Sequence, residues 1–397
     1  MTPPLPSLDS LYAARARGAL PPLQGAAQAA RVPLLSLTFG LADPALFPRV
    51  ELAAATANVL ADDAPDALNY GPSFAGLTEQ VLARLRAQGV EAGPENILIG
   101  YGSSQILALL PEVFVDRGDT VIIEGPSFMG AVRRFAMVGA NLVTVPTDGA
   151  GMDVDALEVT LRDLAARGVR AKFIYTIPTF HNPSGVTMSL ARRQRLVALA
   201  AAYEVVVVED DAYGELRFRG DDLPTLAALD TEGWVVRVCT YSKILAPGVR
   251  LGWAYARPEI IERLNMFKLE GGNGPFLTRV IARYAADGRL EAHITRLRGH
   301  YREKCDVMLE AIRREFPAEV RADRPDGGFF VWCRLPQGVR ATALLERAHA
   351  EGVTFLPGVN CYANGQGDDA IRLAFSFQPA AQIQEGVARI ARAMRGL

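Results

Sequence analysis

One lysine lies in a setting that could support chemistry. The chain has 42 basic residues, but only four are lysines, and Thr240 and Ser242 closely precede Lys243. An apolar stretch, residues 235–239, leads into this run, and Arg250 follows a Pro-Gly turn. An uncharged lysine amine can form an imine with a carbonyl compound, and hydroxyl groups with an arginine can hold a phosphate. The combination suits a lysine that binds pyridoxal phosphate; the alternative is a solvated lysine at a strand end.

A glycine-containing turn is a second candidate for phosphate binding. Residues 100–105, Gly-Tyr-Gly-Ser-Ser-Gln, follow a predicted strand, and Ser103 and Ser104 begin a predicted helix. Free backbone N–H groups at a helix start bind phosphate well. The Gly-x-Gly spacing with Glu124 after the next strand also resembles part of a dinucleotide fingerprint, but Gln105 replaces its third glycine. The turn therefore indicates a phosphate site or a plain loop, and it disfavours a nicotinamide-dependent oxidoreductase.

Three further polar positions could serve either a ligand or the fold. Asn182 begins an Asn-Pro-Ser-Gly sequence, which by itself is typical of a turn. Asp210 ends an apolar run, where a carboxylate can cap the next segment or pair with a protonated ring nitrogen. Arg372 lies inside an apolar strand and, if buried, needs an anionic partner, either a substrate carboxylate or an internal acid.

Composition argues against several classes of protein. The formal charge is −2 and no basic tract is present, which argues against a nucleic-acid binder. No apolar run has transmembrane length, and the N-terminus lacks the pattern of an export signal. The cysteines are scattered and the histidines lack metal-ligand spacing, so we expect no metal, no disulfide framework and a cytoplasmic location. His293 and His300 are expected at the surface.

The apolar pattern predicts an α/β fold with a mostly parallel sheet. Short apolar runs alternate with helix-length segments between residues 97 and 256, as in sheets that helices cover on both faces. The predicted strands are 97–99, 121–123, 142–145, 173–177, 205–208, 235–239 and 252–256. Helices are predicted over 103–115, 153–167 and 189–203. Ligands collect at the carboxyl ends of such strands, and the motifs above lie there.

The length and a change of pattern after residue 290 predict two domains. A long charged helix from 290 towards 316, strands at 327–332, 353–356 and 371–375, and a helix from 380 indicate a smaller α+β domain. We expect a large domain over 45–285. The N-terminal arm, 1–44, would join 286–397 in the small domain, with one short helix in its first 35 residues.

The order of these motifs resembles that of the class I pyridoxal-phosphate-dependent aminotransferases, whose architecture is called fold type I. The resemblance extends from residue 36 to residue 376 and includes Asp210 three residues before Tyr213, and Lys243 followed by Arg250. Residues 41–48, Leu-Ala-Asp-Pro-Ala-Leu-Phe-Pro, look most like the 2-aminoadipate and kynurenine aminotransferase subgroup.

The resemblance implies a role for each site residue. Lys243 would bind the cofactor through an imine and then move the substrate proton, Asp210 would keep the ring nitrogen protonated, and Arg372 would hold the substrate carboxylate. Gly40 would line the substrate site with Asn182. The remaining implied contacts are with the ring oxygen (Asn182 and Tyr213), the ring face (Phe128) and the phosphate (Ser103, Ser104, Thr240, Ser242 and Arg250).

The resemblance also implies a homodimer in which Tyr70 reaches the phosphate of the neighbouring subunit. The implied reaction belongs to amino-acid metabolism: an amino group passes from an amino acid to a 2-oxo acid, expected to be 2-oxoglutarate, by a ping-pong mechanism. The alternatives are a pyridoxal-phosphate-dependent C–S lyase and a regulator-like domain that only senses the cofactor. The sequence departs from the family pattern at Phe128, Thr38, Phe39 and His181.

Overall fold

The centre of the molecule is an eight-stranded sheet. The structure, a computed structural model, describes residues 11–13, 34–270 and 272–395. The strand order is β2-β9-β8-β7-β6-β3-β4-β5. The strands are β2 (Ile97–Gly100), β3 (Thr120–Gly125), β4 (Asn141–Asp148), β5 (Gly151–Met152), β6 (Ala171–Thr176), β7 (Val206–Asp210), β8 (Val235–Thr240) and β9 (Gly252–Tyr255). The run from β4 through β3, β6 and β7 to β8 is parallel, and β9 is antiparallel to both neighbours. The prediction of a mostly parallel sheet is confirmed.

The two faces of this sheet bury two separate cores, because successive residues of a strand point to opposite sides. Ile122 and Val207 face one core together with residues of α7 (Val154–Ala166) and α8 (Leu190–Ala202). Val121 and Val208 face the other core with residues of α5 (Ser103–Phe114), α6 (Met129–Met137) and α10 (Pro258–Met266). Helices therefore cover both faces, and the predicted helices at 103, 153 and 189 are confirmed within one residue at each end.

Two of these helices begin at a side chain that accepts hydrogen bonds from the first backbone N–H groups of the helix. The Asp153 carboxylate accepts hydrogen bonds from the backbone N–H groups of Asp155 and Ala156 at the start of α7. The Ser189 hydroxyl accepts one from the Arg192 N–H at the start of α8. Such caps satisfy donors that have no partner within the helix, and they fix where the chain turns back after each strand.

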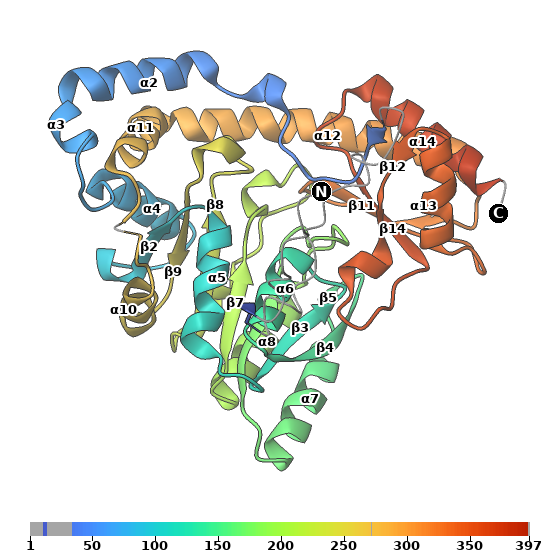
Figure 1. The fold of residues 1–397 in the computed structure, drawn as a ribbon, viewed down its shortest axis with the longest axis horizontal. Helices are drawn as coiled ribbons and strands as arrows, with labels where there is room; N and C mark the ends of the chain where they lie inside the picture. Colours follow the sequence, from blue (N-terminus) through green and yellow to red (C-terminus); the bar gives the residue numbers. More distant parts are fainter. Residues whose placement is uncertain (1–10, 14–33, 271, 396–397) are drawn as a thin grey trace, which may run out of the picture.

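A second sheet lies beyond a long helix. Figure 1 shows α12 (Arg289–Glu315) running along the top of the molecule from α11 towards α14. The second sheet has the order β10-β11-β14-β13, and all its pairs are antiparallel. Its strands are β10 (Arg321–Ala322), β11 (Phe330–Arg334), β13 (Leu356–Pro357) and β14 (Ala370–Ala374), with helices α13 (Ala341–Ala350) and α14 (Ala380–Met394). The other α-helices of the described residues are α2 (Arg49–Asp62), α3 (Ala64–Ala67), α4 (Ala75–Ala87), α9 (Leu226–Leu229) and α11 (Pro275–Ala285).

The N-terminal segment joins the smaller part of the molecule. Strand β1 (Leu35–Ser36) pairs in parallel with β12 (Val353–Thr354), which brings residues 38–41 towards β14. The short helix expected in the first 35 residues lies mostly outside the described residues. The strand predicted from residue 327 begins instead at Phe330, because the φ of 71° at Gly328 is left-handed and interrupts the extended backbone.

The expectation that both α12 histidines lie at the surface is wrong for His293, which is 5% exposed. His293 follows Leu290 by three residues and precedes Leu297 by four, so it lies on the stripe that α12 buries. Its Nδ1 lies 3.0 Å from a guanidinium nitrogen of Arg296. The absence of metal-ligand spacing gives no information on burial, which here follows from the positions of the apolar residues around the helix.

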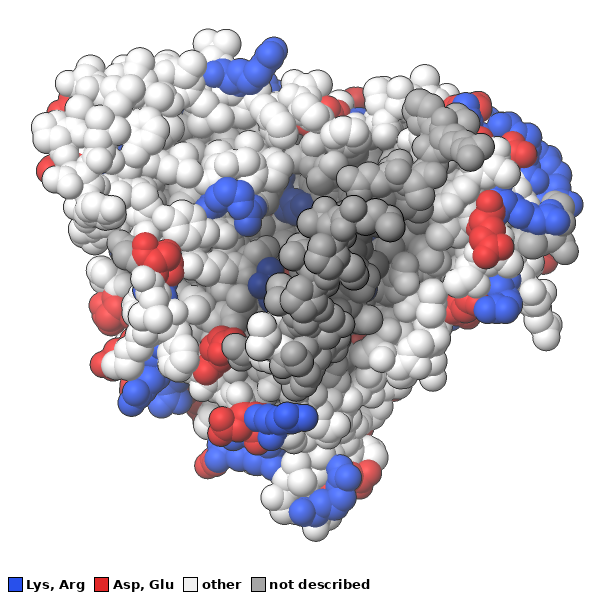
Figure 2. Space-filling model, in the orientation of Figure 1, with Lys and Arg blue, Asp and Glu red and all other residues white. Residues whose placement is uncertain are grey.

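The face of the molecule that Figure 2 shows carries charges of both signs. Figure 2 shows acidic and basic side chains side by side along the lower and right edges of the visible face, without a continuous basic stripe among the described residues there. Within the same residues, no helix has both the length and the apolar character needed to cross a membrane.

Candidate active site

A cavity of about 300 Å³ gathers residues that are far apart in the sequence. It lies where β7 and β8 end and where the segment before α2 meets β14. Every site residue named from the sequence except Tyr70 lines it: Gly40, Ser103, Ser104, Phe128, Asn182, Asp210, Tyr213, Thr240, Ser242, Lys243, Arg250 and Arg372. Tyr70 is 98% exposed and lies outside this cavity.

Lys243 follows β8 and has no carboxylate partner among the described residues. Its Nζ donates a hydrogen bond of 2.8 Å to the Gly40 carbonyl and lies 5.8 and 5.6 Å from the ring centres of Tyr213 and Phe329. Burial lowers the pKa of this amine to about 8, and the positive charge of Arg372 acts in the same direction. An appreciable fraction of the amine is therefore uncharged near neutral pH and able to act as a nucleophile.

Asp210 and its neighbour Asp211 have different environments. Asp211 pairs with the buried guanidinium of Arg237, at 2.6 Å. Asp210 Oδ2 accepts a hydrogen bond of 2.6 Å from the Tyr175 hydroxyl, whereas its buried Oδ1 has no hydrogen-bond partner among the described residues. Burial raises the pKa of Asp210 to about 6. Asp210, rather than Asp211, is therefore the carboxylate with a free oxygen at the cavity.

The start of α5 and the segment after β8 together form a polar cradle. Gly102 precedes the helix with a φ of 70°, and a Cβ there would lie 3.0 Å from an Arg250 guanidinium nitrogen, so glycine suits both the backbone and the close approach. The hydroxyl of Thr240 donates to that of Ser242 at 2.9 Å. The Arg250 guanidinium donates to the Pro247 carbonyl at 3.3 Å and to the Tyr101 carbonyl at 3.4 Å, with no carboxylate partner among the described residues. This cradle can hold an anion.

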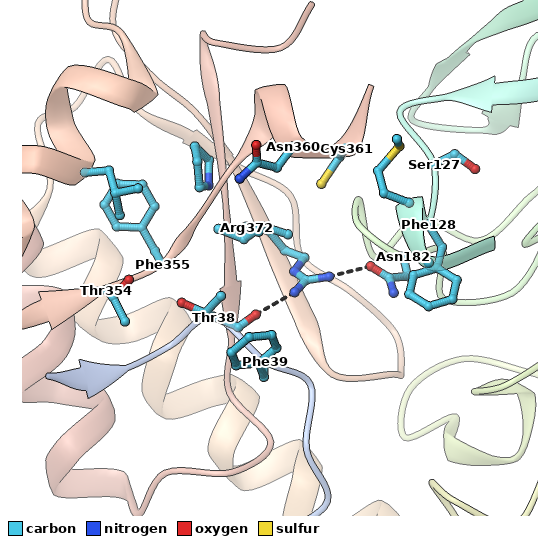
Figure 3. A pocket seen from close by; sticks show the side chains of 15 residues that line it. Thr38, Phe39, Ser127, Phe128, Asn182, Thr354, Phe355, Asn360, Cys361 and Arg372 are labelled. Atoms are coloured by element: carbon cyan, nitrogen blue, oxygen red, sulfur yellow. Dashed lines mark hydrogen bonds between the residues drawn. The ribbon is translucent and has the colours of Figure 1, made fainter. Parts of the chain in front are cut away.

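Arg372 reaches the site from β14 and is buried. Figure 3 shows its guanidinium between Asn182, whose Oδ1 accepts a hydrogen bond of 2.6 Å, and Thr38, whose carbonyl accepts another. The guanidinium carbon lies 4.1 Å from the centre of the Phe330 ring. The Nε atom has no partner and no carboxylate pairs with this arginine within the described residues, so the internal-acid alternative is not supported.

A second cavity of about 330 Å³ adjoins the first. The two share Phe39, Phe128, Asn182 and Arg372, so the arginine lies at their junction. Figure 3 shows Phe355 and Thr354 on one side of this arginine and Phe128 on the other. Most of this lining could not be predicted from the sequence: Ser127, Met129, Gly130, Leu345, Thr354, Phe355, Leu356, Pro357, Asn360 and Cys361. These residues carry no motif, and only the packing of the two sheets brings them together.

The dinucleotide alternative required Glu124 to bind a ribose, and the structure assigns this residue elsewhere. Glu124 is buried, and its two oxygens accept hydrogen bonds of 2.9 Å from the Thr176 hydroxyl and the Ile177 N–H. His181 Nε2 lies 3.1 Å from Glu124 Oε2 but is not aligned for a hydrogen bond. Glu124 therefore supports the end of β6 and is not available to a ligand.

The observed groups fit pyridoxal phosphate. An unpartnered carboxylate oxygen of Asp210 can accept the N–H of a protonated pyridine ring, and a buried amine with a lowered pKa, Lys243, can bind its aldehyde. The cradle around Arg250 offers the donors that a phosphate needs. These three features lie around one cavity, as binding of this cofactor requires.

Comparison with known proteins agrees with this geometry. Residues 38–390 match the family model of class I and II aminotransferases. The chain is 40% identical over 371 residues to a 2-aminoadipate transaminase of Thermus thermophilus, which covers 92% of this chain and 91% of that protein. It is 36% identical over 367 residues to aromatic-amino-acid aminotransferase 1 of Thermococcus litoralis, covering 91% and 88% of the two chains. The solved structure of a Pyrococcus horikoshii kynurenine aminotransferase matches with a TM-score of 0.94 at 34% identity, over 98% of both chains.

The predicted family, fold class, cofactor and enzyme class are thereby confirmed, including the likeness to the 2-aminoadipate and kynurenine enzymes. The chain therefore belongs to the class I and II aminotransferases, and it is a pyridoxal-phosphate-dependent aminotransferase of fold type I.

Proposed function

We propose that this enzyme moves the amino group of an amino acid to a 2-oxo acid, expected to be 2-oxoglutarate, by a ping-pong mechanism. The observation that carries the proposal is the placement of Lys243, Asp210 and Arg372 around one cavity. When bound, the cofactor supplies an aldehyde that takes up the amino group and a ring that accepts the electron pair left at Cα. The protein residues supply binding, orientation and proton transfer.

Lys243 is proposed to hold the cofactor and to move the proton. Once the substrate amine has replaced it, the free Nζ would take the proton from Cα and pass it to the cofactor carbon that had carried the aldehyde. A base that alternates with its conjugate acid works best with a pKa near the working pH, and burial brings the pKa of Lys243 to about 8. The Gly40 carbonyl, which accepts from Nζ at 2.8 Å, would hold the amine on the cavity side.

Different residues are proposed to hold the ring nitrogen, the ring face, the ring oxygen and the phosphate of the cofactor. Asp210 would face the ring nitrogen through Oδ1, and Phe128 would cover a face of the ring. Asn182 and Tyr213 would form hydrogen bonds with the ring oxygen. The phosphate would lie in the cradle formed by Ser103, Ser104, Thr240, Ser242 and Arg250.

Arg372 is proposed to bind the substrate α-carboxylate. A guanidinium has five N–H groups, and two hydrogen bonds to neutral oxygens leave Nε–H and further Nη hydrogens free. These can contact a carboxylate through two parallel bonds. A carboxylate fixed in this way orients the Cα–H bond towards the base, which is the purpose of such a clamp.

The adjoining cavity is proposed to take the side chain of the substrate. Among its described lining residues, Arg372 alone carries a charge, and Phe39, Met129 and Phe355 contribute apolar surface. We therefore expect donors with large uncharged side chains to react well. The similar proteins named above, for 2-aminoadipate, aromatic amino acids and kynurenine, define the first donors to compare.

We also propose a cytoplasmic homodimer in which Tyr70 completes the partner's site. Leu68 and Tyr70, in the segment between α3 and α4, are 66% and 98% exposed, and two large exposed side chains so close in the chain support a surface that a partner covers. The division into a large domain, 45–285, and a small one, 1–44 with 286–397, remains part of the proposal. It is supported by the two sheets, which draw their strands from 97–255 and 321–374.

A half-reaction tests the proposal. With an amino donor and no acceptor, the cofactor absorbance should change stoichiometrically to that of the pyridoxamine form, and adding 2-oxoglutarate or another 2-oxo acid should restore it. Release of pyruvate and ammonia from cysteine-like donors, without the pyridoxamine form, would contradict transamination and favour the lyase alternative.

A further inference from the structure

Tyr175 is a buried residue of β6 that reaches the carboxylate proposed to face the cofactor. It is 0% exposed, and its ring meets Phe135 edge-on at 5.3 Å. In the parallel pairing of β6 with β7, Tyr175 lies opposite Val208, so Asp210 is two residues further towards the carboxyl end on the same face. The Tyr175 side chain extends past Val208 towards the carboxyl end of β7, and its hydroxyl donates to Asp210 Oδ2 at 2.6 Å.

The charge on Asp210 depends on several groups around it. The carboxylate is 4% exposed, and burial is the largest cause of its raised pKa of about 6. The negative charges of Asp211 and Glu124 act in the same direction, whereas the Tyr175 hydrogen bond and the Lys243 charge lower the pKa. The titratable groups that face it are Tyr175 on β6, Glu124 on β3 with His181 beside it, Asp211, Tyr213, and Lys243 after β8.

We propose that Tyr175 is a positioning residue that keeps Asp210 ionised and turned so that Oδ1 faces the cofactor ring. The inference rests on the proposed role of Asp210. Tyr175 occupies one oxygen, and the other is buried without a partner in the described part of the chain. The carboxylate therefore has one orientation in which a ring N–H completes its bonding.

The same hydrogen bond decides where a proton shared with the ring resides. A donor to a carboxylate stabilises its charged form, so Tyr175 makes Asp210 a weaker competitor for the proton than the ring nitrogen. A hydrogen bond to a charged group changes such an equilibrium roughly tenfold or more. Without it, the proton would shift towards Asp210, and the ring would lose the charge that makes it an electron acceptor.

Tyr175→Phe separates this role from a packing role, because phenylalanine keeps the ring contact with Phe135 and removes only the hydroxyl. Tyr284→Phe is the matched control, since Tyr284 is also buried and lies outside both cavities. The readouts are the melting temperature, the cofactor retained by the holoenzyme after dialysis at pH 7 and pH 9, and the pH profile of kcat/KM.

In Tyr175→Phe we expect the acid limb of kcat/KM to move up by about one pH unit or more. Cofactor retention should fall about tenfold at pH 7 and recover towards pH 9, where the carboxylate is ionised in both proteins. KM for the donor should change less than about threefold, because Arg372 is untouched. Tyr284→Phe should match the wild type in each measurement, and in an Asp210→Asn background Tyr175→Phe should have no further effect.

A folded Tyr175→Phe enzyme with the wild-type acid limb and wild-type retention would overturn the inference. The inference would also be overturned if Tyr175→Phe had its full effect in the Asp210→Asn background. Such an effect could not act through the Asp210 carboxylate, because that variant lacks it. If Asp210→Ala itself kept normal turnover, the proposed role of Asp210 would fail. Loss of activity in Asp210→Ala beside a normal Tyr175→Phe would leave that role intact and reject this inference alone.

Discussion

Replacing Arg372 with methionine removes the clamp proposed for the substrate carboxylate and keeps much of the side-chain volume. The guanidinium has free N–H groups for two parallel bonds to a carboxylate. Each hydrogen bond to a charged group contributes about 1.5–3 kcal/mol, so the pair contributes about 3–6 kcal/mol. We therefore expect kcat/KM to fall by roughly 10²–10⁴. Arg372→Lys keeps the positive charge but not the two parallel N–H groups of a guanidinium, so its kcat/KM should fall less than that of Arg372→Met.

The same change should not unfold the protein. Arg372 is buried without a carboxylate partner among the described residues. Methionine removes the desolvation cost of a buried charge that has no counter-charge, and this gain offsets the loss of the hydrogen bonds to the Asn182 Oδ1 and the Thr38 carbonyl. The free energy of unfolding from denaturant titration should therefore stay within about 2 kcal/mol of the wild type in Arg372→Met. Arg334→Met, an exposed position on the neighbouring strand β11, is the control and should leave both stability and activity unchanged.

The decisive assay compares an amino acid with the amine that lacks its carboxylate, each in the half-reaction without acceptor. In the wild-type enzyme, kcat/KM for the amino acid should exceed that for the amine by roughly the factor by which Arg372→Met lowers kcat/KM. In the variant, the two substrates should have similar kcat/KM values. Arg372 does not bind the substrate carboxylate if Arg372→Met keeps kcat/KM within about threefold of the wild type, or if the variant still prefers the amino acid over the amine.

Three further predictions concern neighbouring groups. Asp210→Ala should lower turnover by orders of magnitude and leave the protein folded. Asp211→Ala removes the carboxylate that pairs with the buried Arg237, so in denaturant titrations the free energy of unfolding should fall by about 3–5 kcal/mol. Because burial lowers the pKa of Lys243 from 10.5 to about 8, the unfolded chain binds more protons between those values. The stability of the cofactor-free enzyme should therefore rise from about pH 8 to 10.5, and Lys243→Ala should remove that contribution when denaturation midpoints are compared. Mixing Tyr70→Ala with Lys243→Ala should recover some activity if sites are shared between subunits, and a fully active monomer in sedimentation would end the homodimer proposal.

The elements that position the site were predictable because their physical signals are local. Buried β-branched runs identified the strands that end at Asp210 and Thr240, and Gly102 before Ser103 marked the start of α5. The motifs at these ends also converge on one cavity in the structure. In a parallel sheet, strand ends on one edge must meet, so sequence order already constrains the site.

The missing parts have no local signal. Tyr175 resembles an ordinary core aromatic, and only the register of β6 against β7 brings its hydroxyl to Asp210. The carbonyls of Thr38 and Gly40, which accept from Arg372 and Lys243, are backbone groups that any residue would supply. The adjoining cavity depends on the packing of the second sheet, which no motif encodes.

The central claim is that Lys243 carries the cofactor, and the other lysines provide an internal comparison. Each of the other three is paired with a carboxylate: Lys172 with Asp119 at 3.2 Å, Lys268 with Glu270 at 2.7 Å and Lys304 with Asp43 at 2.6 Å. Lys243 has no such partner among the described residues, and burial brings its pKa to about 8.

Borohydride reduction of the holoenzyme followed by peptide mapping tests this claim most directly. We expect one pyridoxyl group per chain, on Lys243, and none in Lys243→Ala. A label on Lys172, Lys268 or Lys304, with Lys243 unmodified, would contradict it.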